Sequence, residues 1–528
     1  MRPKDRAKIG RARASLVRAL GLSRVQIQEP YHKRKIIHDP IWGTCKYETW
    51  EAALLDLEVF QRLRGLKQTG FAYLTYPAAE HSRFQHSLGV VEAASRVFNS
   101  IVDRLSDDGL GPGAKAAGKR LKVFRTESAR RRWRILLRVA ALVHDTGHSL
   151  FSHTSERIYG LVPQLQHLSE ILTGPSAKRP GAAEVVVYLL VTSTQWQRLV
   201  ARIWRQTTKS VRAPTPAEWE RIGRWIMGQE TDPSLKFLAD IISGPLDADK
   251  LDYISRDGYS AGIPVGYDLA RLISTICVDP QRATRRGRKW WRLTLPIRGI
   301  NALEQLVMGR LVLNSYLYHH QKCRAAEAAF ERALAREHVR NGTIAGRRNI
   351  WDLFSLRDAD LLEFARKRGQ PSKEAGDLIR RTLRVQIAQF RYEDLRVQSE
   401  RASVAFNSLL ELGVPRTWTD YRALLRIEDT IARMAGLKNG SVIVDIPKAP
   451  SYADLENLLL PGRTAAQKES PTKVLNYRDW IAAYSAHRTF VRVFCPRGQQ
   501  IEDAAWNAAR RYFASTGLVL SRNVRFRH

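Results

Sequence analysis

One stretch places side chains that bind metals directly after an apolar run. In ALVHDTGHSLFSH, residues 141–153, the apolar lead-in is followed by His144, Asp145, His148 and His153. His144 and Asp145 are adjacent and cannot share one helix face, but at a helix end, before the dipeptide TG, the backbone can turn both into one cavity. Imidazole and carboxylate suit divalent transition metals, so the stretch indicates part of a metal site.

Two further segments carry matching residue types. RFQHSLGVVEAA places His86 at the start of an apolar helix, and DADKLDYISRDG places Asp249, Tyr253 and Asp257 four residues apart along one helix face. Each residue alone is also explained as a satisfied core histidine or a surface aspartate. Two histidines and two aspartates from three segments together favour a hydrolytic metal site with an open position for water.

The elements that must position these residues are mostly helical. Apolar residues recur at helical spacing over 50–68, 87–102, 133–143 and 303–335, and a further helix is expected to begin near Pro216. Later, the β-branched runs 441–447 and 489–496 predict strands, and 501–516 predicts a helix. The expected fold class is therefore mainly α, a helical core with a smaller α+β C-terminal lobe.

The domain organisation follows from these patterns. Residues 1–30 are basic and predict a loosely ordered arm or a short helix. Residues 31–330 are expected to form the core, with insertions near 105–132 and 205–235, and residues 331–528 the C-terminal lobe.

Composition limits the location of the chain. It has 44% hydrophobic residues, no apolar run long enough to cross a bilayer and no secretory signal, so a soluble protein without a membrane partner is expected. The four cysteines lie far apart without a CxxC pair, which predicts neither a disulfide framework nor a zinc knuckle and fits the reducing cytoplasm. A transit peptide in the basic leader is the alternative location signal.

The net charge of +34 predicts attraction to polyanions such as nucleic acid, acidic lipid or nucleotides. The basic arm and the basic stretch 119–134 favour non-specific nucleic-acid binding, either by a nuclease that uses the same metal site or by a binder in which the metal site is secondary. Against this, basic residues are spread over the whole chain and no nucleic-acid-binding fold is recognisable.

The motifs together resemble the HD-domain phosphohydrolases, in particular the deoxynucleoside triphosphate triphosphohydrolase branch. The resemblance rests on six motifs in the order that the branch uses, and on a seventh, FVRVFCPRGQQ with AARRYF, in the C-terminal lobe; the six are IIHDPIWG, VFQRLRGLKQTG, YPAAEHSRFQHSLGV, HDTGHSLFSH, DADKLDYISRDG and YLYHHQK. It covers most of residues 34–515, without a recognisable SAM domain. It implies that Mg²⁺, Mn²⁺ or Fe²⁺ is bound by His86, His144, Asp145 and Asp249.

The resemblance also assigns substrate and catalytic roles. Arg83 would hold the α-phosphate, and Lys250 and Arg310 the outer phosphates. His148 and His153 would face the phosphates, with His153 as proton donor, supported by Glu156, which stands where an aspartate is usual, and by His167. The remaining assignments concern the nucleoside: Gln68, Tyr253 and Asp257 around the deoxyribose, Tyr318 and His319 at the base.

The implied reaction is hydrolysis of a dNTP to a deoxynucleoside and tripolyphosphate. The resemblance further implies a homo-oligomer, a dimer or tetramer, activated by a dGTP-type nucleotide at Lys35, Asp56, Gln61 and Arg64. The same metal chemistry could act on a monophosphate, a cyclic or a modified nucleotide, but a monophosphate would leave Lys250 and Arg310 unused.

Overall fold

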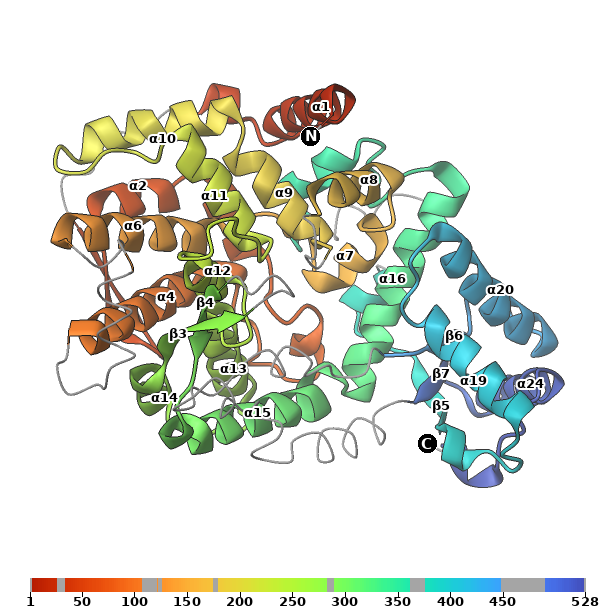
Figure 1. Cartoon of the computed structure of the whole chain (residues 1–528). Helices are drawn as coiled ribbons and strands as arrows, with labels where there is room; N and C mark the ends of the chain where they lie inside the picture. The colour runs from red at the N-terminus through yellow and green to blue at the C-terminus, as the bar shows by residue number, and fades with distance from the viewer. Residues whose placement is uncertain are drawn as a thin grey trace.

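The computed structural model describes residues 2–25, 34–106, 121, 126–173, 179–282, 289–360, 376–447 and 490–526. Most of this chain is helical, with two short hairpins and one three-stranded sheet, as Figure 1 shows. The predicted fold class, mainly α with a smaller α+β C-terminal lobe, is confirmed. Within the described ranges, no helix combines the length and the apolar character needed to span a membrane.

The larger part of the molecule is a set of helices around one hydrophobic cluster. Its two antiparallel hairpins are β1 (Lys35–Asp39) with β2 (Gly43–Tyr47), and β3 (Cys277–Arg282) with β4 (Lys289–Thr294). Its helices, in chain order, are α1 (Pro3–Ala19), α2 (Thr49–Leu55), α3 (Glu58–Gln61), α4 (Arg83–Ser106), α6 (Glu127–Val143), α7 (His153–Tyr159), α8 (Pro163–Leu172), α9 (Ala182–Val191), α10 (Thr194–Thr207), α11 (Pro216–Ile226), α12 (Lys236–Ile242), α13 (Ala248–Ala261), α14 (Leu269–Thr275), α15 (Ile300–Leu313) and α16 (Gln321–Asn341).

Helices α4 and α13 approach each other closely, and this approach depends on Gly89. A Cβ atom on Gly89 would lie 1.8 Å from Asp252 Oδ1 and 2.4 Å from Arg256 Nη2, so only glycine fits between the two helices. Because His86 lies one turn before Gly89 on α4, the contact brings His86 to the first turn of α13.

The C-terminal lobe has its own sheet and hydrophobic cluster. The antiparallel strand order is β5 (Val385–Phe390), β7 (Val491–Cys495), β6 (Ile443–Asp445). Its helices are α19 (Glu400–Leu412), α20 (Trp418–Met434) and α24 (Gln499–Ser515). In Figure 1 this lobe lies beyond α16 from the larger part. The two strands predicted at its end are confirmed with shorter bounds, and the predicted helix 501–516 is confirmed as α24, whereas β5 was not predicted.

Two predicted long helices are interrupted in the structure. One break buries a side chain in the core, and the other presents side chains to a cavity. The predicted helix 50–68 consists of α2, α3 and a 3₁₀ turn, Arg62–Gly65, which turns Arg62 into the core. The predicted helix 303–335 consists of α15 and α16, separated by a π-helical turn, Asn314–Tyr318. Such turns often occur at functional sites, and this one presents Tyr318 and His319 to a cavity described below.

Of the two alternatives predicted for residues 1–30, a loosely ordered arm or a short helix, the structure shows a helix, α1. Helix α1 buries Ile9 and Leu16 in the larger hydrophobic cluster, so its apolar face outweighs its charge. The expected insertion 205–235 contributes α11, whose Trp219 and Trp225 are buried. Most of the insertion expected near 105–132 lies outside the described residues. The boundary expected at residue 331 falls inside α16, and the hydrophobic clusters change mainly between Leu378 and Val385.

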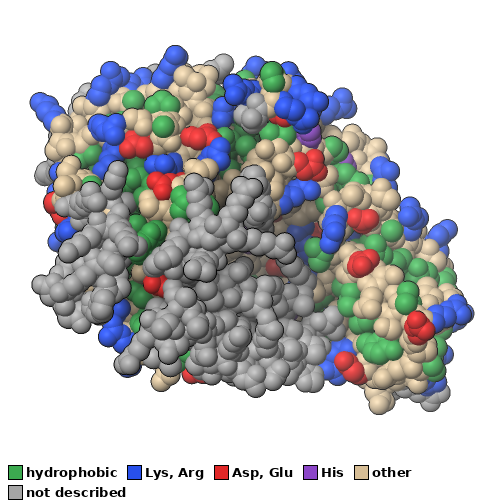
Figure 2. Space-filling model, in the orientation of Figure 1, with side chains coloured by type: hydrophobic (Ala, Val, Ile, Leu, Met, Phe, Trp, Pro, Cys, Tyr) green, Lys and Arg blue, Asp and Glu red, His purple; other side chains and the backbone are tan. Residues whose placement is uncertain are grey.

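The basic side chains form no single patch on the visible face. Figure 2 shows Lys and Arg spread over the described surface, from the helical part to the C-terminal lobe, with Asp and Glu between them. This distribution matches the dispersed charge along the sequence.

Candidate active site

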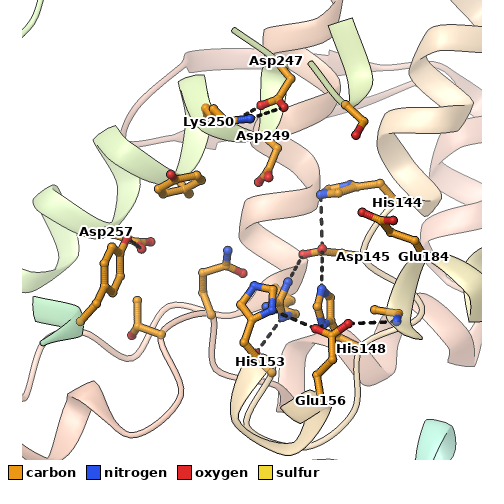
Figure 3. Close-up of a pocket in the computed structure, with 18 of the residues that line it drawn as sticks. His144, Asp145, His148, His153, Glu156, Glu184, Asp247, Asp249, Lys250 and Asp257 are labelled. Carbon is orange, nitrogen blue, oxygen red and sulfur yellow. Dashed lines mark hydrogen bonds and ion pairs between the residues drawn. The ribbon is translucent and has the colours of Figure 1, made fainter. Parts of the chain in front are cut away.

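The four predicted metal ligands converge from three helices. His86 lies in the first turn of α4, His144 and Asp145 directly follow α6, and Asp249 lies in the first turn of α13. His86 Nε2 is 2.9 Å from Asp249 Oδ1 and 3.8 Å from Asp145 Oδ2. His144 Nε2 is 3.3 Å from Asp145 Oδ1 (Figure 3). The buried His86 and the half-buried Asp249 thus complete the group begun by the HD dipeptide.

The ring nitrogens of this group are arranged as metal ligands. His86 Nδ1 lies 2.7 Å from Asp252 Oδ2, and His144 Nδ1 lies 2.6 Å from the Ala141 carbonyl oxygen, so each Nδ1 is the hydrogen-bond donor. Both Nε2 atoms are buried and face carboxylates, His86 Nε2 at 2.9 Å from Asp249 Oδ1 and His144 Nε2 at 3.3 Å from Asp145 Oδ1, without the alignment of a regular hydrogen bond. Their lone pairs point toward carboxylates, and metal bonds of 2.0 to 2.1 Å would place neighbouring ligand atoms about 3.0 to 3.4 Å apart.

The charge balance also fits a cation. Burial alone would lower the pKa of His86, but the carboxylates of Asp249, Asp252 and Asp145 outweigh it and raise the pKa to about 10. This excess of carboxylates around one ring indicates a site for positive charge. The residues present therefore fit a divalent metal ion bound by two imidazoles and two carboxylates.

Arg83 joins this group to a second set of residues. Its Nη1 donates to Asp145 Oδ2 at 2.7 Å, and its Nε donates to Ser152 Oγ at 2.7 Å. Burial raises the pKa of Asp145, but Arg83 and the neighbouring histidines outweigh it and hold the pKa well below the ordinary range. Arg83 Nη2 is buried and has no hydrogen-bond partner among the described residues, so one donor remains for an anion.

The turn before α7 has unusual backbone geometry. Phe151 and Ser152 have φ of 50° and 56°, a left-handed region that side chains other than glycine rarely adopt. The Phe151 amide donates to Asp358 Oδ1 at 2.6 Å, and Ser152 Oγ donates to the Lys67 carbonyl at 2.6 Å. These bonds hold the strained turn, which places His153 at the start of α7.

His148, His153 and Glu156 form a second cluster. Glu156 Oε2 lies 3.0 Å from His153 Nδ1 and 3.6 Å from His148 Nδ1. Its Oε1 accepts a hydrogen bond from the Ala183 amide at 3.1 Å. Burial alone would raise the pKa of Glu156, but the hydrogen bond from His153 and the charge of His148 lower it to about 2. Burial and the Arg83 charge hold the pKa of His148 well below the ordinary range.

His167 does not join this cluster. It lies on α8 with Nε2 2.7 Å from Lys8 Nζ and Nδ1 3.7 Å from Glu170, and it does not line the cavity. The assignment of His167 as the residue that orients His153 is therefore corrected. Its place on an exposed face of α8 keeps it beside α1, and Glu156 is the described residue that contacts His153 Nδ1.

A cavity of about 1120 Å³ opens beside both clusters. His144, Asp145 and Asp249 lie on its wall, and so do His148, His153 and Glu156. Its wall also includes all eight residues predicted to contact the substrate: Gln68, Arg83, Lys250, Tyr253, Asp257, Arg310, Tyr318 and His319.

Two of these wall residues are held by specific contacts. Lys250 Nζ donates to Asp247 Oδ2 at 2.6 Å and to the Gly244 carbonyl oxygen at 2.7 Å (Figure 3). Asp257 accepts from Tyr318 Oη at 2.5 Å, and its other oxygen lies 2.8 Å from His81 Nε2. Burial, reinforced by the Asp257 charge, raises the pKa of Tyr318 well above its usual range, so Tyr318 is the donor.

Several supporting residues were not predicted from the sequence. Asp252 orients His86, and buried Arg62 donates to the carbonyls of Thr146 at 3.0 Å and His148 at 2.7 Å, which holds the loop after α6. Asp358 bonds the amides of both Lys67 and Phe151. Asp252 lies three residues after Asp249, so helical spacing offered a signal for it. No local pattern marks Arg62 or Asp358.

The four residues predicted to bind an activating nucleotide lie together on the surface. Lys35 Nζ pairs with Asp56 at 3.0 Å, and Gln61 Oε1 accepts from Arg64 Nε at 2.9 Å. Burial raises the pKa of Asp56, and the nearby charge of Arg64 partly offsets this effect. The Arg64 guanidinium also lies 3.7 Å from the centre of the Phe84 ring.

Comparisons with known proteins agree with this geometry. The family model described as "HD associated region" matches residues 267–467. The chain is 27% identical over 362 residues to an uncharacterised Methanocaldococcus jannaschii protein, covering 68% of this chain and 61% of that protein. It is 27% identical over 277 residues to the Dictyostelium discoideum homolog of deoxynucleoside triphosphate triphosphohydrolase SAMHD1, covering 50% of this chain and 46% of that protein.

A third relative and one solved structure complete the comparison. SAMHD1 of Bos taurus is 26% identical over 249 residues, which cover 45% of this chain and 38% of that protein. The crystal structure of a hypothetical Aquifex aeolicus protein matches with a TM-score of 0.58 and 20% identity, covering 90% of this chain and all of that one. The chain spans about 38 to 61% of the length of these curated relatives. The site and these matches support an assignment of the chain to the HD-domain, dNTPase-like superfamily.

Proposed function

We propose that the protein is a metal-dependent dNTP triphosphohydrolase, which cleaves a dNTP to a deoxynucleoside and tripolyphosphate. The observation that carries this proposal is the group His86, His144, Asp145 and Asp249 beside a large cavity, with the free Nη2 of buried Arg83 next to Asp145. The relatives named as dNTP triphosphohydrolases support the substrate class.

The protein's own residues would bind and orient the substrate. Arg83 Nη2 would donate to the α-phosphate, while Lys250 and Arg310 on the same cavity wall would bind the outer phosphates. A divalent ion, Mg²⁺, Mn²⁺ or Fe²⁺, would lower the pKa of a water molecule and favour its attack on the α-phosphorus. Asp145 would contribute both to metal binding and to the positioning of Arg83 for the phosphate, because it lies in the metal group and pairs with Arg83.

The departing 5′-oxygen needs a proton, and His153 is placed to supply it. Its ring is 73% exposed to the cavity and solvent, and Glu156 accepts at its Nδ1, which orients the ring. Among the other residues of the cavity wall, Gln68, Tyr253 and Asp257 would contact the deoxyribose, and Tyr318 and His319 the base.

The test is product analysis with each dNTP and NTP, in the presence of Mg²⁺, Mn²⁺ or Fe²⁺, singly and with mixed dNTPs. Tripolyphosphate and deoxynucleoside are expected. Asp249→Ala and His144→Ala should abolish turnover, because each removes a metal ligand, whereas His167→Ala is the matched control and should keep it. Release of pyrophosphate or monophosphate, or full turnover in folded Asp249→Ala, would contradict the proposal.

We further propose that a dGTP-type nucleotide binds at Lys35, Asp56, Gln61 and Arg64 and promotes a dimer or tetramer. An aspartate and basic groups, which lie close together here, suit a guanine edge and phosphate. Mass measurement by light scattering with and without dGTP should show a larger assembly with the nucleotide, and a smaller response in Arg64→Ala. A monomer under both conditions contradicts this regulation.

The four free cysteines fit a cytoplasmic location.

A further inference from the structure

The second cluster, His148, His153 and Glu156, lies on the opposite side of Asp145 from His144 (Figure 3). One atom of each residue, two ring nitrogens and a carboxylate oxygen, lies within 4.8 Å of the other two. The ring centroids of the two histidines are 4.7 Å apart and their planes are 85° apart, so the rings meet edge to face rather than stack.

His148 carries the strongest sign of a ligand at this position. Its side chain is only 8% exposed, and its Nδ1 has no hydrogen-bond partner among the described residues although it is directed at Glu156 Oε2, 3.6 Å away. Its Nε2 lies 3.5 Å from Asp145 Oδ1. A histidine whose one nitrogen faces a carboxylate and whose other nitrogen has no partner is the arrangement found behind metal ligands.

The other two residues fit the same role. Glu156 Oε1 accepts from the Ala183 amide at 3.1 Å, which fixes the carboxylate and leaves Oε2 toward both rings. His153 Nδ1 lies 3.0 Å from that oxygen, and its ring is 73% exposed, so it can rotate and an ion can reach it. The two measured distances, 3.0 and 3.6 Å, are close to the separation of about 3.0 to 3.4 Å expected between ligands of one zinc ion.

We propose that His148 Nδ1, His153 Nδ1 and Glu156 Oε2 form a second metal site, for a borderline transition-metal ion such as Zn²⁺. Two imidazoles and one carboxylate favour Zn²⁺ or Co²⁺ over Mg²⁺, which prefers oxygen ligands and water. The site is distinct from the group around His86, and Asp145 connects the two because it faces both His144 and His148. This binding goes beyond the proposed function. A metal ion here would occupy His153 Nδ1 and Glu156 Oε2, so it would replace the hydrogen bond that orients His153 as proton donor, and the two states of the cluster exclude each other.

The test counts bound ions. The full-length protein is stripped of metal, titrated with Co²⁺ against a chromogenic chelator, and the bound equivalents are determined together with the visible absorption of the Co²⁺ complex. His153→Ala is the informative variant, because this exposed side chain can be removed with little effect on folding. It should bind one equivalent fewer than the wild type and lose one set of Co²⁺ absorption bands.

Two further variants make the result specific. His167→Ala removes a surface histidine that lies outside both clusters and should bind as many equivalents as the wild type. His144→Ala should lose the Co²⁺ ion bound at the group around His86 and keep the Co²⁺ ion bound at the second cluster. This outcome separates the second site from the proposed function. If His153→Ala binds as many equivalents as the wild type, with the same spectrum, the second site does not exist.

Discussion

Asp358 is a single carboxylate that connects two segments of the site, although it touches neither cluster. One oxygen accepts from the Phe151 amide at 2.6 Å and the other from the Lys67 amide at 2.7 Å. The first bond holds the strained turn before His153, and the second holds the segment that leads to Gln68. Asp358 is thus a buried carboxylate that accepts hydrogen bonds from two backbone amides.

Protonation of Asp358 should be visible in stability. Burial raises its pKa to about 6, although the two amide donors and nearby Lys67 and Arg83 act in the opposite direction. An unfolded aspartate has a pKa of about 3.9, so the folded state binds the proton more tightly. The contribution of Asp358 to the free energy of unfolding is therefore largest below about pH 4, and it falls by about 3 kcal/mol as the pH rises through 6.

Urea unfolding at several pH values measures this effect. The free energy of unfolding of the wild type should fall more steeply between pH 4 and pH 6 than that of Asp358→Asn. Asp360→Asn, at an exposed position two residues away, is the matched control and should keep the wild-type slope. Equal slopes for the wild type and Asp358→Asn would show that Asp358 has an ordinary pKa.

The loop between α6 and α7 fits under α9 because Gly147 has no side chain. A Cβ atom there would lie 2.1 Å from the Ala183 carbonyl oxygen and 2.9 Å from Val187 Cγ2. Arg62 fixes the same loop from the other side through the Thr146 and His148 carbonyls. The loop that carries the HD pair is thus clamped between a helix and a buried guanidinium.

Gly147→Ala should therefore move α9 away from the loop. We expect a loss of stability of at least about 1 to 3 kcal/mol, as for other overpacked interiors, together with weaker metal binding because His144 and Asp145 move. Chemical unfolding and metal titration measure the two effects. Gly10→Ala, on the exposed face of α1 with no atom near the added Cβ, should instead be neutral or stabilising by about 0.5 to 1 kcal/mol. Wild-type stability in Gly147→Ala would contradict the close packing.

Helix α16 connects the larger part of the molecule to the C-terminal lobe through buried ion pairs. Arg324 Nη2 donates to Asp445 on β6 at 2.6 Å, and Arg332 Nε donates to Glu428 on α20 at 2.8 Å. Arg157 on α7 bonds Glu331 of α16 at 3.0 Å and the Gly413 carbonyl at 2.8 Å. Because α7 also carries His153 and Glu156, the lobe is physically linked to the second cluster.

Removal of one partner in this network should be costly. Glu428→Gln removes the carboxylate that pairs with Arg332 Nε and leaves the longer pair with Glu331, 3.4 Å from Nη1, and we expect a loss of about 3 to 5 kcal/mol. Asp377→Asn breaks an exposed pair with Arg380 and should cost at most about 1 kcal/mol. Urea unfolding compares the two variants. A loss in Glu428→Gln no larger than that in Asp377→Asn would mean that the network contributes little to the joining of the lobe.

Local patterns were enough to predict α4, α6 and α24, because an apolar face repeats at helical spacing within each of them. They also identified His86, His144, Asp145 and Asp249, whose residue types are unusual at the ends of such helices. Local pattern did not predict the breaks in 50–68 and 303–335. These breaks depend on contacts with distant segments, those of Arg62 with the loop after α6 and that of Tyr318 with Asp257.

Long-range contacts decided the rest of the site. The family resemblance implied a role for His167, but the packing of α8 against α1 places it beside Lys8 and away from His153. Asp358 acts on a turn 207 residues away, and His86 meets Asp252 across 166 residues of chain. Sequence periodicity reports only which face of an element is apolar. Which buried donor meets which acceptor is decided when the elements pack, because each buried polar group must then find a partner.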